Sequence, residues 1–117
     1  MIPKKKRDKI LERDDGRCVA CGSMWQLTIH HRVNRGSGGS KLFDGFEYLL
    51  AVCNPCNVSF EASAEVADMA RKLGYKLPRN ANPPVDATQE PVYYQYLSKW
   101  YLLDTNGRKK EAHEQRN

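Results

Sequence analysis

Long apolar stretches are missing from this chain, and hydrophobic residues make up only 40% of its 117 residues. A membrane-spanning helix needs roughly 20 apolar residues in a row, so we expect no membrane partner. The basic start, Met1–Arg7, has no apolar run behind it. It therefore does not match a secretory signal, and we expect a cytoplasmic location. A chain with so few apolar residues has a modest core, to which a bound metal would add stability.

Acidic residues are outnumbered: 14 Asp and Glu stand against 19 Lys and Arg, a net charge of +5. This excess favours a polyanionic partner such as DNA, although a merely soluble basic protein would have the same excess. The basic run Lys4–Arg7 is expected in the first turn of a helix, with its side chains facing phosphate.

Cysteine is rare as well, but its four copies form two close pairs, Cys18-x-x-Cys21 and Cys53-x-x-Cys56. Each pair can bind one tetrahedral zinc, and two pairs make a closed site that is structural because no position is left for water. In a chain expected in the cytoplasm, this pattern favours Zn²⁺ over disulfides. The alternative is two redox dithiols or buried reduced cysteines.

The hydrophobic pattern of the first two thirds predicts an α+β domain. We expect a helix over 7–14, a strand over 27–29 that leads into two histidines, and a buried strand over 48–52. A long helix is predicted from residue 57 to about 73, and Gly74 is expected to end it.

The last third predicts a proline-rich crossing followed by a hairpin. Residues 78–91 are expected to be extended, and the turn sequence Asp-Thr-Asn-Gly lies between the predicted strands 100–103 and 108–111. Residues 112–117 are expected to fray. We expect residues 1–77 to form the core and residues 78–117 to pack on it.

The most specific pattern lies between the cysteine pairs and just beyond them. It consists of His30-His31-Arg32, the glycine-rich stretch 35–40, and Leu49-Leu50-Ala51-Val52-Cys53-Asn54-Pro55-Cys56-Asn57 with Glu61. This order over about residues 7–77 resembles HNH endonucleases, especially the small ones encoded by bacteriophages. The resemblance implies a ββα-metal (His-Me finger) fold, in which two strands and a helix hold one catalytic divalent ion and the zinc knuckles brace the outside.

The resemblance also implies roles for single residues. His30 would bind the catalytic ion and His31 would be the general base. The third ligand, usually histidine, is here Asn57, whose carbonyl oxygen suits Mg²⁺ or Mn²⁺. The position of the family's central asparagine is Tyr48, which cannot donate an amide to the base loop. These two departures also suit a catalytically weakened module.

Phosphodiester hydrolysis needs a base that titrates near neutral pH and a positive charge on the phosphate, which a histidine and a divalent ion supply. Neighbours in a regular strand point to opposite faces, so we expect the chain to turn at His30-His31 if both serve one site. The alternative is an exposed pair at a strand end, or alternative zinc ligands.

Several neighbours are predicted to support this site. Arginine grips phosphate with two N–H groups, so Arg32 and Arg35, together with Lys41, are expected to contact DNA; the alternative is a solvated loop. Glu61, one helical turn after Asn57, is expected to orient it or to approach the ion, unless it is an ordinary exposed glutamate. Six aromatic residues are expected to fill the core rather than stack on bases: Trp25, Tyr93, Tyr94, Tyr96, Trp100 and Tyr101.

The sequence therefore predicts a metal-dependent DNA endonuclease of low sequence specificity. A role in phage genome processing or packaging, beside a terminase, is implied by the resemblance alone. Two alternatives stay open: a zinc-binding DNA-binding module whose catalytic site has decayed, and a zinc-stabilised protein-interaction domain without salt-sensitive DNA affinity. The sequence indicates no particular oligomeric state.

Overall fold

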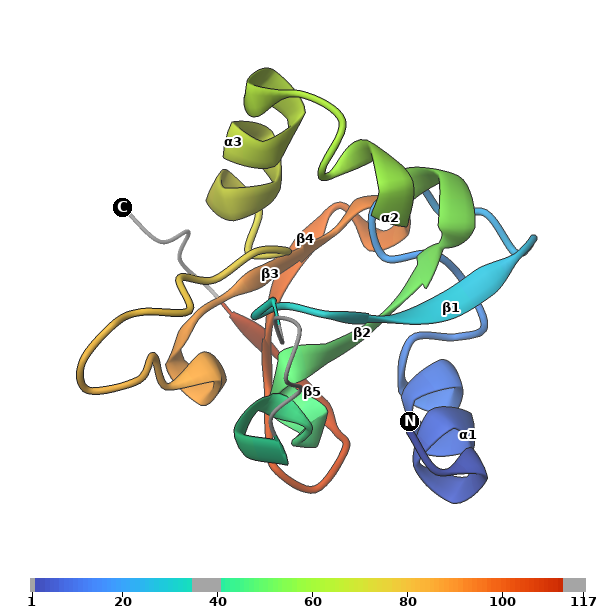
Figure 1. The fold of residues 1–117 in the computed structure, drawn as a ribbon. Helices are drawn as coiled ribbons and strands as arrows, with labels where there is room; N and C mark the ends of the chain where they lie inside the picture. Colours follow the sequence, from blue (N-terminus) through green and yellow to red (C-terminus); the bar gives the residue numbers. More distant parts are fainter. Residues whose placement is uncertain (1, 35–40, 113–117) are drawn as a thin grey trace.

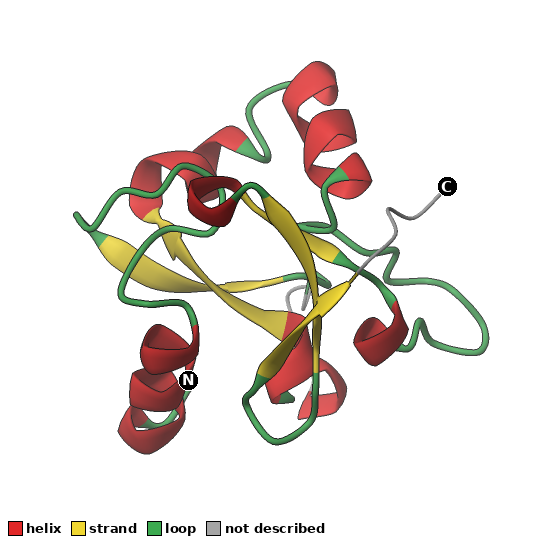
Figure 2. Cartoon of the chain, turned by 180° about the vertical axis from the view of Figure 1, so that it is seen from behind, coloured by secondary structure: helices red, strands yellow, loops and turns green. Residues whose placement is uncertain are grey.

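Two small antiparallel sheets and three helices make up the α+β fold of the computed structural model, which describes residues 2–34 and 41–112 (Figures 1 and 2). One sheet pairs β1 (Leu27–His31) with β2 (Leu49–Cys53). The other has the order β3 (Val92–Tyr94), β4 (Lys99–Leu103) and β5 (Lys109–Ala112). The helices are α1 (Lys4–Arg13), α2 (Asn54–Ser59) and α3 (Ala64–Lys72). None of them, within the described ranges, has the length and apolar character to cross a bilayer.

Strand β2 is the centre of the fold, because it is buried on both faces. Its residues Leu49 and Ala51 pack with Ile10 of α1, whereas Leu50 and Val52 belong to a larger cluster on the opposite face. Figure 1 shows α1 on one side of the β1–β2 pair and α2 and α3 on the other. A strand covered on both faces must be apolar throughout, so the prediction of a buried strand here is confirmed.

The C-terminal sheet closes the larger cluster. Val92 and Tyr94 of β3 and Leu103 of β4 are buried there against β2. Strands β4 and β5 form the predicted hairpin across the Asp-Thr-Asn-Gly turn. Strand β3 was not predicted, because three residues are too short to show a periodic pattern. Residues before and after position 78 therefore share one core.

The long helix predicted over 57–73 is wrong, because two shorter helices occupy this segment. Helix α2 already begins at Asn54, with a proline in its first turn, and ends at Ser59. Helix α3 starts anew after Ser63, whose side chain accepts a hydrogen bond from the Val66 N–H at 3.2 Å. Apolar residues continue at helical spacing across this break and so conceal it.

Gly74 ends α3 as predicted. It has a φ of +85°, and a side chain there would place its Cβ 2.1 Å from the carbonyl oxygen of Pro91. This close approach brings the chain after α3 against the start of β3.

Not every aromatic residue lies where the sequence analysis expected. Tyr94 is fully buried, in agreement with the expectation. The expectation for Trp25 is wrong, because its side chain is 75% exposed in the loop between the first cysteine pair and β1.

Helix α1 begins three residues before the predicted start, so the run Lys4–Arg7 forms its first turn.

One fully buried carboxylate joins three elements of the fold. Asp14 accepts hydrogen bonds from the Arg13 guanidinium (2.8 and 3.0 Å), from the Tyr94 hydroxyl (2.6 Å) and from the Ala51 N–H (2.9 Å). Arg13 donates further to the Leu49 carbonyl at 2.6 Å. Burial alone would lower the pKa of Arg13, but the attraction of Asp14 outweighs it and raises that pKa. Arg13 therefore remains charged, and the hydrogen bonds of Arg13 and Asp14 tie α1 to β2 and β3.

We expect Asp14→Ala to lower the free energy of unfolding by about 3–5 kcal/mol, because it leaves the Arg13 charge buried without its partner. Guanidinium denaturation followed by circular dichroism measures this loss. Asp8→Ala is the control, because Asp8 pairs with Lys4 on the exposed face of α1 and should change stability by less than about 1 kcal/mol. Equal losses in the two variants would contradict the assigned importance of Asp14.

Candidate functional site

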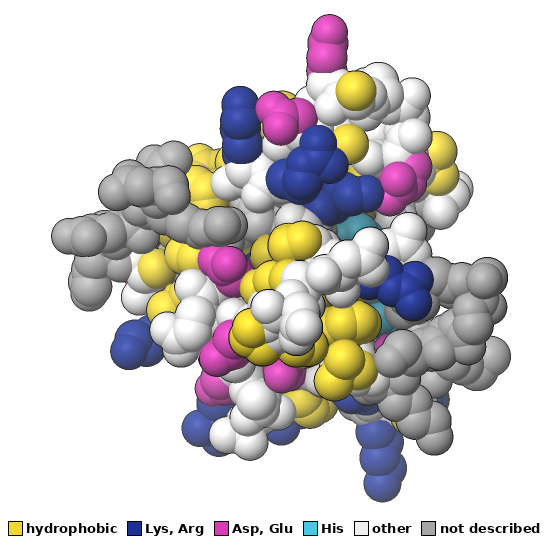
Figure 3. Space-filling view, turned by 60° about the vertical axis from the view of Figure 1, so that its left-hand side comes forward, with side chains coloured by type: hydrophobic (Ala, Val, Ile, Leu, Met, Phe, Trp, Pro, Cys, Tyr) yellow, Lys and Arg dark blue, Asp and Glu magenta, His cyan; other side chains and the backbone are white. Residues whose placement is uncertain are grey.

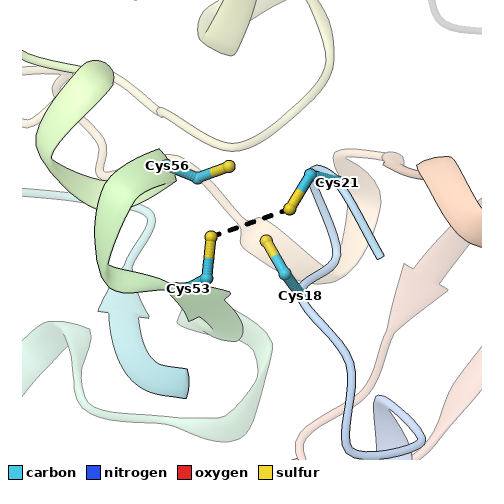
Figure 4. Close-up of side chains that lie close together, drawn as sticks. All are labelled: Cys18, Cys21, Cys53 and Cys56. Carbon is cyan, nitrogen blue, oxygen red and sulfur yellow. Dashed lines mark hydrogen bonds between the residues drawn. The ribbon is translucent and has the colours of Figure 1, made fainter. Parts of the chain in front are cut away.

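The four cysteines meet at one point, as the sequence predicts (Figure 4). Their sulfur atoms lie within 4.8 Å of one another, the Sγ atoms of Cys21 and Cys53 are 3.6 Å apart, and all four are free thiols. Zn–S bonds of about 2.3 Å place the sulfurs of a tetrahedral site roughly 3.8 Å apart. The cluster therefore fits a closed zinc site.

Two local structures present these thiols. Cys18 and Cys21 belong to a turn in which the Gly22 N–H donates to the Cys18 carbonyl at 2.7 Å. Cys53 is the last residue of β2, and Cys56 lies on α2. Burial raises the pKa of the Cys18 thiol to about 11. Zinc binding would therefore release protons, and it would fix the N-terminal loop to the junction of β2 and α2.

A polar pocket of about 620 Å³ lies beside α2, and five residues that the sequence analysis singled out line it: His30, His31, Arg32, Asn57 and Glu61. Its other lining residues are Ile29, Asn34, Lys76, Leu77 and Arg79. Figure 3 shows Lys and Arg side chains next to the two patches of histidine that reach this face of the molecule.

His30 forms the inner wall of the pocket. Its Nε2 lies 2.7 Å from the Tyr75 carbonyl oxygen, and its Nδ1 lies 3.0 Å from Oδ1 of Asn57. Burial lowers the pKa of His30, so the ring is neutral at neutral pH. Because a carbonyl can only accept, Nε2 carries the proton and Nδ1 presents its lone pair to Asn57.

His31 has a different partner. Its Nε2 lies 3.0 Å from Oδ1 of Asp44, and both side chains are about one-fifth exposed (19% and 21%). The backbone carbonyl of Asp44 accepts a hydrogen bond from Lys6 of α1, which fixes the segment that carries this carboxylate. Asp44 escaped the sequence analysis, because one aspartate in a loop carries no signal of its own.

The predicted turn at the histidine pair is wrong. Both residues lie in β1, where His30 pairs with Leu50 and His31 with Leu49. Their side chains therefore leave opposite faces of the strand, one toward α2 and the other toward Asp44. The two residues nevertheless line the same pocket, because it opens at the end of the strand.

Arg32 does not fit the predicted contact with DNA. Its side chain is 1% exposed, and its guanidinium donates to four backbone carbonyls, those of Glu47, Gly74, Ala87 and Glu90. Burial lowers its pKa to about 10, so the group stays charged at neutral pH. Arg32 therefore holds the surrounding loops together, and four of its five N–H donors are engaged by backbone carbonyls rather than phosphate.

Tyr48 also points away from the pocket. Its hydroxyl donates to the Val85 carbonyl at 2.7 Å, and its ring packs edge-on against Phe43, with ring centroids 5.3 Å apart. It belongs to a separate apolar cluster. Two other DNA contacts were predicted: Arg35 lies outside the described residues, and Lys41 is described only as part of a short 3-10 turn. The tail 113–117, which was expected to fray, also lies outside the described residues.

Glu61 reaches the pocket by another route than predicted. Helix α2 ends at Ser59, so Glu61 lies in the turn after it rather than one helical turn along from Asn57. Its carboxylate accepts a hydrogen bond from Lys76. Lys76 and Arg79 were not predicted, because only the packing of the segment after Gly74 against β1 brings them here.

No protein-family model, curated protein or solved structure matches this chain. The functional argument therefore rests on the side chains themselves. They form a four-cysteine cluster that could hold zinc and, beside it, a pocket that combines two histidines, two asparagine amides, a carboxylate and cations.

We expect the purified protein to carry one zinc per chain, and Cys18→Ser to lose both the metal and much of the stability, because the site closes the fold between the two cysteine pairs. Zinc content and thermal unfolding measure the two effects. Val58→Ala, on the exposed side of α2, is the control and should keep its zinc. A wild-type protein that folds fully without metal would contradict this assignment.

Proposed function

We propose that this chain is a metal-dependent endonuclease that hydrolyses phosphodiester bonds of DNA, and that β1, β2 and α2 form the ββα-metal unit of an HNH endonuclease. One observation carries the proposal: His30 with its partner Asn57, and His31, which pairs with Asp44, line one pocket at the end of β1 that also contains Lys76 and Arg79. Together they offer candidate ion ligands, a candidate base and positive charge.

The donor atoms of His30 and Asn57 fit a divalent ion. Adjacent ligands of an octahedral ion with bonds of about 2.1 Å lie roughly 3 Å apart, and Nδ1 of His30 and Oδ1 of Asn57 are 3.0 Å apart. Without an ion, the Asn57 amide can turn its N–H toward the Nδ1 lone pair; with an ion between them, its oxygen takes that place. Imidazole and amide donors both suit Mn²⁺, and an amide oxygen suits Mg²⁺.

The chemistry assigned to the chain is an attack of water on phosphorus. His31 takes a proton from the water while the new P–O bond forms and the bond to the leaving oxygen breaks. When Nε2 of His31 donates to Asp44, the other ring nitrogen has the lone pair that a base needs, so Asp44 sets the tautomer. A bound Mg²⁺ or Mn²⁺ would stabilise the negative charge that develops on the phosphate oxygens.

DNA is the substrate that the charges favour. The net charge is +5, and Lys76 and Arg79 line the pocket where a phosphate would lie. Contacts of this kind recognise the backbone rather than the bases, so low sequence specificity follows. The same charges make affinity fall with salt, which separates this proposal from a zinc-stabilised protein-interaction domain.

The second candidate is a DNA-binding module with a weakened catalytic site. Two observations favour it: the Tyr48 side chain is turned into an apolar cluster, and Asn57 offers an amide oxygen, which is a weaker ligand than an imidazole nitrogen. Both candidates share the zinc site and the basic pocket, and they differ only in the rate of hydrolysis.

We expect the protein to nick supercoiled plasmid with Mg²⁺ or Mn²⁺, and His31→Ala to lower the rate by about 10²–10⁴-fold, because the general base is removed. Gel analysis of the plasmid forms over time measures the rate. Asp8→Asn, on the exposed face of α1, should leave cleavage unchanged. Cleavage that survives His31→Ala would mean that another residue is the base.

Asp44→Asn should slow the same reaction by roughly 10–100-fold, as the loss of a residue that orients a functional histidine does. DNA affinity should remain unchanged, because Asp44 is not assigned to phosphate binding. A binding titration beside the cleavage assay separates the two effects. A loss of affinity with unchanged cleavage would contradict the orienting role.

Asn57→His distinguishes the two candidates. If Asn57 only weakens the ion site, histidine should raise cleavage at low Mn²⁺ concentrations, because imidazole is the stronger ligand. Cleavage should then be followed across a Mn²⁺ titration for both proteins. Absence of cleavage in both, despite salt-sensitive DNA binding, would favour the non-catalytic module.

A further inference from the structure

Lys76 forms an ion pair with Glu61 within the pocket, and its environment is unusual for a lysine. Its side chain is 18% exposed, whereas that of Glu61 is 64% exposed. The Lys76 ammonium is therefore held near the pocket wall, and the carboxylate approaches it from the solvent side. Surface ion pairs of lysine contribute little to stability, so the position of this pair calls for a functional reason.

The backbone ties Lys76 to the candidate ion ligand. The preceding residue, Tyr75, accepts the hydrogen bond from Nε2 of His30 at 2.7 Å, and the Tyr75 ring stacks on Phe60, with ring centroids 5.5 Å apart. Lys76 and His30 line the same pocket. The ammonium is thus placed to affect a cation bound at His30.

The charges in the pocket are unevenly matched. Among its described lining residues, Glu61 is the only carboxylate. The lining cations are Arg32, Lys76 and Arg79, and the guanidinium of Arg32 already donates to backbone carbonyls. A divalent ion beside His30 would attract the same carboxylate that now neutralises Lys76. Glu61 cannot fully serve both cations.

We propose that Lys76 is a phosphate-binding residue whose charge Glu61 neutralises until a divalent ion binds. Glu61 changes its partner from Lys76 to a divalent ion bound at His30 and Asn57, and the Lys76 ammonium is thereby released to bind a phosphodiester of DNA. This inference rests on the proposed function, and it adds a coupling between the ion and the nucleic acid. The ligand class is a backbone phosphate, which an ammonium binds as a point charge.

Coupling of this kind is reciprocal. If the ion tightens DNA binding by some factor, DNA must tighten ion binding by the same factor, and such factors are typically about 5–150. Lys76→Met removes the released charge, so the ion should no longer strengthen DNA binding through it. Glu61→Gln leaves Lys76 without its partner, so DNA should bind tightly even without the ion.

The test uses the full chain with His31→Ala added to every protein, so that the DNA is not cut during titration. The dissociation constant of a fluorescent DNA duplex is measured by anisotropy with and without Mn²⁺, in metal-free buffer that contains no chelator and therefore spares the zinc. We expect Mn²⁺ to tighten DNA binding by at least about 5-fold when Lys76 is present. With Lys76→Met, we expect Mn²⁺ to tighten DNA binding by less than about 2-fold. Mn²⁺ binding, followed by electron paramagnetic resonance, should tighten equally when DNA is added.

Lys72→Met is the matched control. Lys72 also pairs with an acidic residue, Asp68 at 3.2 Å, but on the exposed surface of α3 and away from the pocket. This variant should keep the full coupling and lose at most the small affinity of one distant charge. Lys76→Arg keeps the positive charge and should keep part of the coupling, which guards against a mere folding defect in Lys76→Met.

The outcomes separate the inference from the function it rests on. Full coupling in Lys76→Met, or weak ion-free binding by Glu61→Gln, would overturn the inference while leaving the nuclease proposal intact. If the protein with both residues in place binds no Mn²⁺, the ion site itself is wrong and both proposals fail.

Discussion

The buried carboxylate of Asp14 is the constraint on which the arrangement of β2 depends. A charge removed from water costs several kcal/mol unless its hydrogen bonds are replaced, and Asp14 replaces them with donors from Arg13, Ala51 and Tyr94. Burial raises the pKa of Tyr94 well above its usual value, so its hydroxyl keeps the proton that it donates. These bonds fix β2 against α1 and β3. Strand β2 pairs with the histidines of β1 and ends at Cys53. The hydrogen bonds of Asp14 therefore also help to position the four-cysteine cluster and the histidine pocket.

Local patterns in the sequence predicted those parts of the fold that local chemistry determines. Two Cys-x-x-Cys pairs need only turn geometry and a shared metal, a five-residue apolar run suffices for β2, and Asp104–Gly107 specifies a turn by itself. The break between α2 and α3 was missed, because it depends on the capping hydroxyl of Ser63 within an unbroken apolar pattern. Strand β3 owes its existence to pairing with β4, which no short window of sequence contains.

The candidate site divides in the same way. His30 and Asn57 could be named from the resemblance to HNH endonucleases, and in the structure Nδ1 of His30 lies 3.0 Å from Oδ1 of Asn57. Asp44 and Lys76 could not, because only the packing of distant segments brings Asp44 to His31 and Lys76 to the pocket. Arg32 shows the opposite error: beside two histidines it reads as a phosphate ligand, yet loops from three parts of the chain present carbonyls that consume its donors. Whether an arginine faces solvent or carbonyls is decided by tertiary packing rather than by its neighbours in sequence.

The hydrogen bond between Asp14 and Tyr94 spans 80 residues, and this distance bears on the order in which the chain can fold as it is synthesised. All four cysteines, both strands of the first sheet and α2 leave the ribosome well before Tyr94 does. Zinc can therefore gather the N-terminal half early, while Asp14 still has water as its partner. The closure of the core around Asp14 waits for β3, so a segment synthesised much later than Asp14 completes the burial of that charge.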